Sequence, residues 1–177
     1  MTFRQNISKF AIGEIDLHSM PAIAFQALEQ GLDTPSLRIL AGLSEDENEY
    51  VIRQYFNDTL KEMSIELPEI RQAAIEAAIT IAGEIFKGNQ KIFEGVQDII
   101  RKALDAFPFR EESKHFCYDS IGFAKAFGLF DTLEDLRDSG STRWQDEKTN
   151  EELEQELNAE LLEELKFWAA SMKPSNP

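Results

Sequence analysis

The stretch PEIRQAAIEAAITIAGEIFKG, residues 68–88, decides the fold class of this chain. Pro68 at its start and Gly88 after its end are typical helix boundaries. The helix between them is apolar almost all round, and its narrow polar stripe recurs at every fourth position: Gln72, Glu76, Thr80 and Glu84. Because a helix with apolar residues on nearly every side has to be buried, we predict that residues 68–87 form the central helix of a bundle.

The remainder of the chain favours helices as well. Apolar residues three and four positions apart, with caps and glycine stops, predict further helices over 19–31, 34–42, 44–63, 94–107, 113–127, 131–140 and 150–172. Only residues 2–14 and 65–67 have patterns compatible with extended chain. We therefore expect an all-α, single-domain bundle of about seven or eight helices over residues 1–177. Residues 1–18 are expected to be an N-terminal extension, and residues 138–150 a polar linker before the C-terminal helix.

The helix predicted over residues 150–172 is amphipathic. Its apolar stripe has spacings of four, four, four, three and four: Leu153, Leu157, Leu161, Leu165, Trp168 and Met172. A helix of this length can cross its own domain or reach a partner chain, so a homo-oligomer formed through it remains an alternative.

The chain is strongly acidic, with 18 basic and 33 acidic residues and a formal net charge of −15. Residues 145–166 contain nine of the acids and two lysines, which is nearly half of the net charge. A chain of this charge repels phosphate backbones. Residues 37–44 have the rhythm of a helix-turn-helix, but acidic residues follow where a recognition helix would meet DNA. We therefore expect no nucleic-acid partner.

Location is predicted from three features. No basic region followed by an apolar region begins the chain, which argues against a secretory signal. The apolar stretches are far shorter than the ~20 residues that a membrane span needs. A single cysteine fits a reducing compartment. We expect a cytoplasmic protein that does not contact membranes.

Reactive side chains are densest at His115, Cys117, Tyr118 and Asp119. Six of the thirteen phenylalanines lie in the same region, residues 107–130, which offers a second reading in which these four residues stand at the mouth of an apolar ligand pocket. Cys–His catalysis needs both side chains within hydrogen-bond reach, and helix positions two apart point in different directions. Only an approach of His18 would supply that geometry.

Metal and cofactor motifs are weak. Glu112 and His115 have the Glu-x-x-His spacing of ferritin-like di-iron bundles, but the motif occurs once, and Glu14 is one position too far from His18. Phosphate-binding loops and nucleophile elbows are absent from the sequence. We expect no cofactor and no metal, and we favour a protein that is not an enzyme.

The acidic C-terminal helix has two interpretations. Its charged face is either simply solvated or a docking surface for a basic protein. In the second interpretation Glu152, Glu156, Glu160 and Glu163 steer the partner, while aromatic residues anchor it: Trp144, Phe167 and Trp168.

The segment ALEQGLDTPSLRILAGL, residues 27–43, resembles a stretch found in small uncharacterised bacterial helical proteins. It covers about a tenth of the chain and contains no catalytic motif. The resemblance implies a bacterial cytoplasmic protein and implies no activity or site residue.

Two functional hypotheses follow. The first is a non-enzymatic protein-binding module with an acidic surface, either an inhibitor of the immunity or antitoxin type or an adaptor. The alternative is a small-ligand-binding protein or enzyme with a pocket in the region 107–130.

Overall fold

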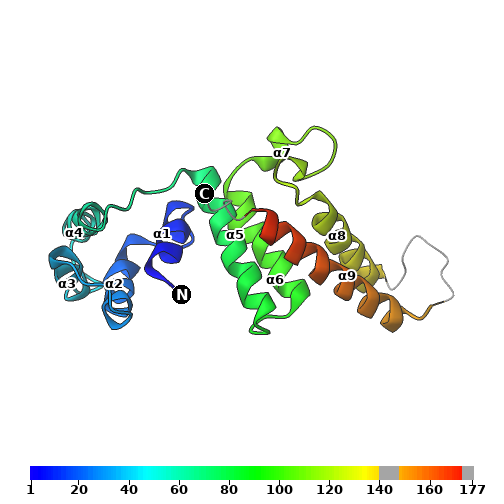
Figure 1. Ribbon diagram of the computed structural model, residues 1–177, viewed down its shortest axis with the longest axis horizontal. Coiled ribbons are helices and arrows are strands. Elements are labelled where there is room, and N and C mark those ends of the chain that lie inside the picture. The colour runs from blue at the N-terminus through cyan, green and yellow to red at the C-terminus, as the bar shows by residue number, and fades with distance from the viewer. Residues whose placement is uncertain (140–147, 173–177) are drawn as a thin grey trace. The chain divides into compact units, whose positions relative to one another are not determined.

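The computed structural model describes residues 1–139 and 148–172 (Figure 1). Within these ranges the chain forms nine α-helices joined by loops and short 3₁₀ and π segments, and no strand occurs in them. The prediction of an all-α fold is therefore confirmed. The chain divides into two compact units, residues 1–77 and 78–177. Helix α5 (Ile70–Phe86) runs unbroken through this division, and the single domain expected for residues 1–177 stays a prediction.

Unit 1 contains α1 (Phe3–Ala11), α2 (Met20–Glu29), α3 (Pro35–Ala41), α4 (Glu49–Glu62) and the first part of α5. Side chains cap three of these helices at their first turn: Thr2 on α1, Thr34 on α3 and Asn48 on α4. Buried apolar residues from all four complete helices form one core: Phe3, Ile7, Leu17, Met20, Ile23, Ala24, Ala27, Leu37, Leu40, Ile52, Phe56 and Leu60.

The N-terminal residues differ from the expectation of an extended segment. Thr2 and Gln5 form a capping box that starts α1, and residues 3–11 are helical. Phe3 and Ile7 lie four positions apart and are both buried in the core of unit 1. The extension expected over residues 1–18 thus supplies core side chains.

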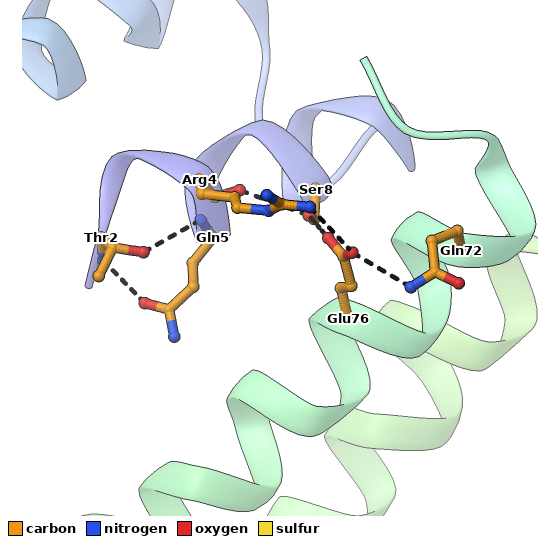
Figure 2. A network of polar contacts seen from close by, with 6 residues as sticks. All are labelled: Thr2, Arg4, Gln5, Ser8, Gln72 and Glu76. Atoms are coloured by element: carbon orange, nitrogen blue, oxygen red, sulfur yellow. Dashed lines mark hydrogen bonds and ion pairs between the residues drawn. The ribbon is translucent and has the colours of Figure 1, made fainter. Parts of the chain in front are cut away.

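A polar network joins α1 to the start of α5 within unit 1 (Figure 2). The Ser8 hydroxyl donates a hydrogen bond to the Glu76 carboxylate, and an Arg4 guanidinium nitrogen lies 3.8 Å from the same group. Gln72 donates to it from one turn earlier on α5, at 3.1 Å. Glu76 of the predicted polar stripe is therefore a contact position for another helix, and Gln72 supports it from within α5.

Unit 2 contains the remainder of α5, then α6 (Ile92–Asp98), α7 (Phe109–Glu112), α8 (Ala124–Ser139) and α9 (Asn150–Ser171). A π segment (Ile99–Ala103) and a 3₁₀ turn (Leu104–Ala106) follow α6 directly. Helices α8 and α9 pack antiparallel, because Lys125 near the start of α8 pairs with Glu164 at 2.9 Å, while Arg137 near its end pairs with Glu154 at 2.6 Å.

The helix predicted over residues 113–127 is wrong. After α7 the chain forms a loop and a 3₁₀ turn (Asp119–Ile121). Tyr118 and Gly122 flank this turn with φ values of 64° and 68°, in the left-handed region that a helix interior does not use. Two separate helices were expected on either side of Gly128. Instead α8 runs through Gly128, which is exposed, and Asp131 and Thr132 lie inside this helix.

Other predicted boundaries shift for local reasons. Helix α4 begins at Glu49, because Asn48 provides the cap and residues 45–47 form a turn. The predicted helix 94–107 is divided into α6 and the two short segments that follow it. Among the described residues, no helix is long and apolar enough to cross a membrane.

Helices α5 and α6 approach closely at Gly95. A Cβ atom placed on Gly95 would lie 2.4 Å from Ile85 Cγ1 and 2.5 Å from Ile85 Cδ1. Ile85 is itself buried, so it has little room to move. Gly128 in α8 is a matched contrast, since a Cβ there meets no atom within 4 Å.

We predict that Gly95→Ala lowers the free energy of unfolding by about 1–2 kcal/mol, because overpacking outweighs the better helix propensity of alanine. Gly128→Ala should raise it by about 0.5–1 kcal/mol, since propensity acts there alone. Urea unfolding followed by circular dichroism at 222 nm measures both. Equal effects from the two substitutions would contradict the close α5–α6 contact.

Candidate functional site

The exposed face of α9 carries an acidic stripe. Glu152, Glu156, Glu160 and Glu163 are all exposed, and at 100° per residue they fall within an arc of about 80°. Phe167 lies in the same arc, and 72% of its surface is exposed. We call these five residues the acidic stripe of α9. It is a charged helix face that ends in an exposed aromatic ring.

The opposite face of α9 is buried in unit 2. Leu161 and Leu165 are fully buried, so the leucine pattern packs within the chain. Trp168 is 1% exposed, and its indole Nε1–H donates to the Ile121 carbonyl at 2.9 Å. Its ring also packs edge-on against Phe123, with centroids 4.8 Å apart.

Burial corrects the prediction that Trp168 anchors a partner. Its ring and its N–H group are both used inside unit 2, so it offers no surface to another protein. Phe167, one residue earlier, points to solvent and takes that place in the site. Trp144, the other predicted anchor, lies outside the described residues.

The acids of the stripe have local partners. Glu156 pairs with Lys148 at 2.6 Å, Glu160 with Lys125 at 3.4 Å and Glu163 with Lys166 at 2.8 Å. Exposed pairs of this kind contribute little to stability and are screened by salt. Together the α8 residues 124–139 and the segment 148–172 hold eleven acids and four basic residues, a net charge of −7.

The N-terminal cap of α9 involves the first glutamate of the acidic stripe. The backbone N–H of Thr149 donates to the Glu152 carboxylate at 2.9 Å, and the Thr149 hydroxyl lies 3.0 Å from the same oxygen. These hydrogen bonds, the backbone one first, lower the pKa of Glu152. The carboxylate at the start of the stripe is therefore ionised and fixed in position.

The four predicted pocket residues lie on the loop after α7, which projects from the helices of unit 2 (Figure 1). His115 and Cys117 are exposed, whereas Tyr118 is buried. The Asp119 carboxylate accepts backbone N–H bonds from Lys114, His115 and Phe116 at 3.1, 2.9 and 3.4 Å. Asp119 thus organises the loop from inside.

Hydrogen bonding sets the charge state of Asp119. The N–H of His115 is the largest cause that lowers its pKa. Burial opposes this effect, and the N–H groups of Lys114 and Phe116 lower the pKa further. A carboxylate satisfied in this way holds the backbone in place and is poorly suited to accept a proton from a substrate.

Tyr118 connects the loop to the body of unit 2. Its N–H donates to the Ser113 hydroxyl at 3.0 Å. Its own hydroxyl donates to Asp105 at 3.1 Å and accepts from Arg110 Nε at 3.4 Å. Burial raises the pKa of this hydroxyl, so it stays protonated at neutral pH. Tyr118 therefore positions Asp105 and Arg110.

A cleft of about 200 Å³ lies beside these two residues. It is lined by Gln97, Ile100, Arg101, Asp105, Arg110, Phe127, Phe130, Asp131 and Glu134. Phe127 and Phe130 belong to the predicted phenylalanine-rich region, but His115, Cys117, Tyr118 and Asp119 are not among the lining residues. The charged lining was missed because it comes from several elements. The spacings of Arg101 to Asp105 and of Asp131 to Glu134 are the only local signals for it.

The remaining candidates have simple surroundings. A ring nitrogen of His18 lies 2.8 Å from the Glu45 carbonyl oxygen in unit 1. In the part of the chain that the structure describes, no three His, Cys, Asp or Glu side chains are grouped to hold a metal ion.

Comparison with known proteins adds no assignment: no family model, curated protein or solved structure matches this chain. A functional proposal has to rest on the geometry of the stripe and the cleft.

We predict that Asp119 titrates below the ordinary aspartate pKa of 3.8. Its folded pKa is lowered, so the stability that it contributes is present above pH 3.8 and is lost as the pH falls through the folded pKa. In an NMR titration the amides of residues 114–116 should shift together with that midpoint.

Asp119→Asn is the control, because it keeps an acceptor oxygen and should abolish this acidic titration of the three amides. A midpoint at or above 3.8 in the unsubstituted protein would show that the carboxylate does not hold the loop.

Proposed function

We propose that this protein is a non-enzymatic binding module whose acidic stripe docks a basic protein. The observation that carries the proposal is the exposed Phe167, which follows four exposed glutamates along one face of α9. Aromatic side chains, phenylalanine included, are enriched at interfaces, where a few well-buried residues supply most of the binding energy. Charges around such an anchor increase the rate of encounter and select partners of the opposite sign.

The stripe also indicates what the partner is like. It needs several lysines or arginines spaced along about four helical turns, with an apolar hollow for the phenyl ring. An inhibitor of the immunity or antitoxin type, or an adaptor, uses a surface of this kind. The net charge of −7 on residues 124–139 and 148–172 disfavours nucleic acid as the partner.

Self-association through α9 is less well supported. Its leucine face is buried within unit 2, and its exposed face carries glutamates that would repel a second copy. The stripe is better suited to a different, basic chain.

The unpaired Cys117 is exposed, which fits the reducing cytoplasm as the compartment in which the two proteins meet.

The test compares two variants of equal charge in a pull-down from native lysate with stepwise salt elution and mass spectrometry. In the first, Glu152, Glu156, Glu160 and Glu163 are changed to Gln, which retains the acceptor of the α9 capping box. In the second, the exposed unit 1 acids Glu45, Glu49, Glu66 and Glu69 are changed to Gln.

We expect the unsubstituted chain and the unit 1 variant to retain the same basic protein. The stripe variant should retain at least about tenfold less of it. Phe167→Ala should weaken capture of the same protein while leaving its salt dependence unchanged, because the ring carries no charge. The proposal fails if no captured protein distinguishes the stripe variant from the unit 1 variant.

A further inference from the structure

The cleft of unit 2 has walls of opposite charge. Arg101 and Arg110 come from the π segment after α6 and from α7, whereas Asp131 and Glu134 come from α8. Asp131 and Glu134 lie three positions apart, so they share one side of their helix. A third carboxylate, Asp105, belongs to the arginine wall and accepts the Tyr118 hydroxyl at 3.1 Å.

Three of these charges have no partner in the part of the chain that the structure describes. Across residues 1–139 and 148–172, Arg101, Asp131 and Glu134 form no ion pair or hydrogen bond through their side chains. The nearby charges are used elsewhere: Lys102 pairs with Asp98 at 2.9 Å, and Arg137 pairs with Glu154 while its guanidinium lies 3.9 Å above the Phe93 ring. The unpaired charges therefore face the cleft without being neutralised by neighbours.

One of the two arginines is already positioned. Arg110 donates to the buried Tyr118 hydroxyl, and its guanidinium lies 5.6 Å from the centroid of the Tyr118 ring. A guanidinium held in this way loses less conformational freedom when it binds an anion, which favours binding. Ile100, Phe127 and Phe130 are the apolar residues of the cleft lining, and Phe127 is half-buried.

We propose that this cleft binds a free α-amino acid with an apolar side chain. The carboxylate of the amino acid meets Arg101 and Arg110, since guanidinium groups recognise carboxylates by paired hydrogen bonds. Its ammonium group meets Asp131 and Glu134, and its side chain covers Phe127 and Phe130. A ligand with one charge only would face repulsion from the opposite wall. The cleft volume of about 200 Å³ suits a ligand of this small size.

The test uses three probes with the same side chain on the full chain, by isothermal titration calorimetry. L-Leucine carries both charges, L-leucinamide lacks the carboxylate and N-acetyl-L-leucine lacks the ammonium group. We expect L-leucine to bind about tenfold or more tightly than either blocked compound, because each of them leaves one charged wall unpaired. Glycine should bind more weakly than leucine, because it leaves the apolar surface uncovered.

Two variants assign the walls. Arg101→Gln should reduce leucine affinity about tenfold, because that contact needs the carboxylate, and should leave leucinamide binding unchanged or stronger, because it removes a repelling charge. Asp131→Asn should weaken the binding of leucine and leucinamide and should leave that of N-acetyl-L-leucine unchanged or stronger. Both residues are exposed, and circular dichroism verifies that the variants fold.

The proposal is overturned if leucine does not bind, or if a blocked compound binds as tightly as leucine. The four-glutamine variant of the acidic stripe should bind leucine normally, since none of its substituted residues lines the cleft. Failure of the stripe as a docking surface and failure of the cleft as a ligand site are therefore distinguishable.

Discussion

The hydrogen bond from the Trp168 indole to the Ile121 carbonyl connects α9, which carries the acidic stripe, to the turn after Tyr118, the residue that positions Arg110 at the cleft. Ile121 ends the 3₁₀ turn that begins at Asp119, and Trp168 lies in the last turns of α9. The indole also packs against Phe123, directly before α8. This one buried side chain therefore fixes the rotation of α9 about its axis. With that rotation set, the glutamates and Phe167 have to face solvent.

Charge in this protein is distributed around that buried contact. The apolar faces of α8 and α9 pack inside unit 2, so the eleven acids and three basic residues of these helices are left on the remaining surface. Lys125 and Arg137 connect the two helices through ion pairs at either end. These pairs set the antiparallel register, but they neutralise only part of the charge. The excess negative charge remains available to a partner.

Local patterns predicted the helices well and the loop poorly. The all-α class followed from apolar periodicity, and the spacing of four, four, four, three and four that runs through Trp168 already placed this residue on the leucine face. The prediction that Trp168 is an exposed anchor rested on its residue type and disregarded its position on the helix. Phe167, which lies 100° away on the same helix, was the residue that position favoured.

The loop and the cleft were beyond local pattern for a physical reason. Tyr118 adopts a left-handed conformation that few non-glycine residues use, and the Asp119 bonds to three preceding amides stabilise the loop. No helical periodicity signals either feature. The cleft draws its charges from separate elements that meet only in the folded chain. Its arginines and carboxylates are ordinary surface residues in the sequence, and only their convergence gives them a chemical meaning.

Helix α8 shows how one element serves both surfaces without coupling them. Lys125 and Arg137 reach towards α9, whereas Asp131 and Glu134 line the cleft. The two sets are separate, so loss of charge in one leaves the contacts of the other in place. What they share is the core beneath them, which includes Phe130, Leu133 and Leu136. A substitution there would disturb both surfaces at once, and that shared loss is the signature that separates a folding defect from the loss of a binding site.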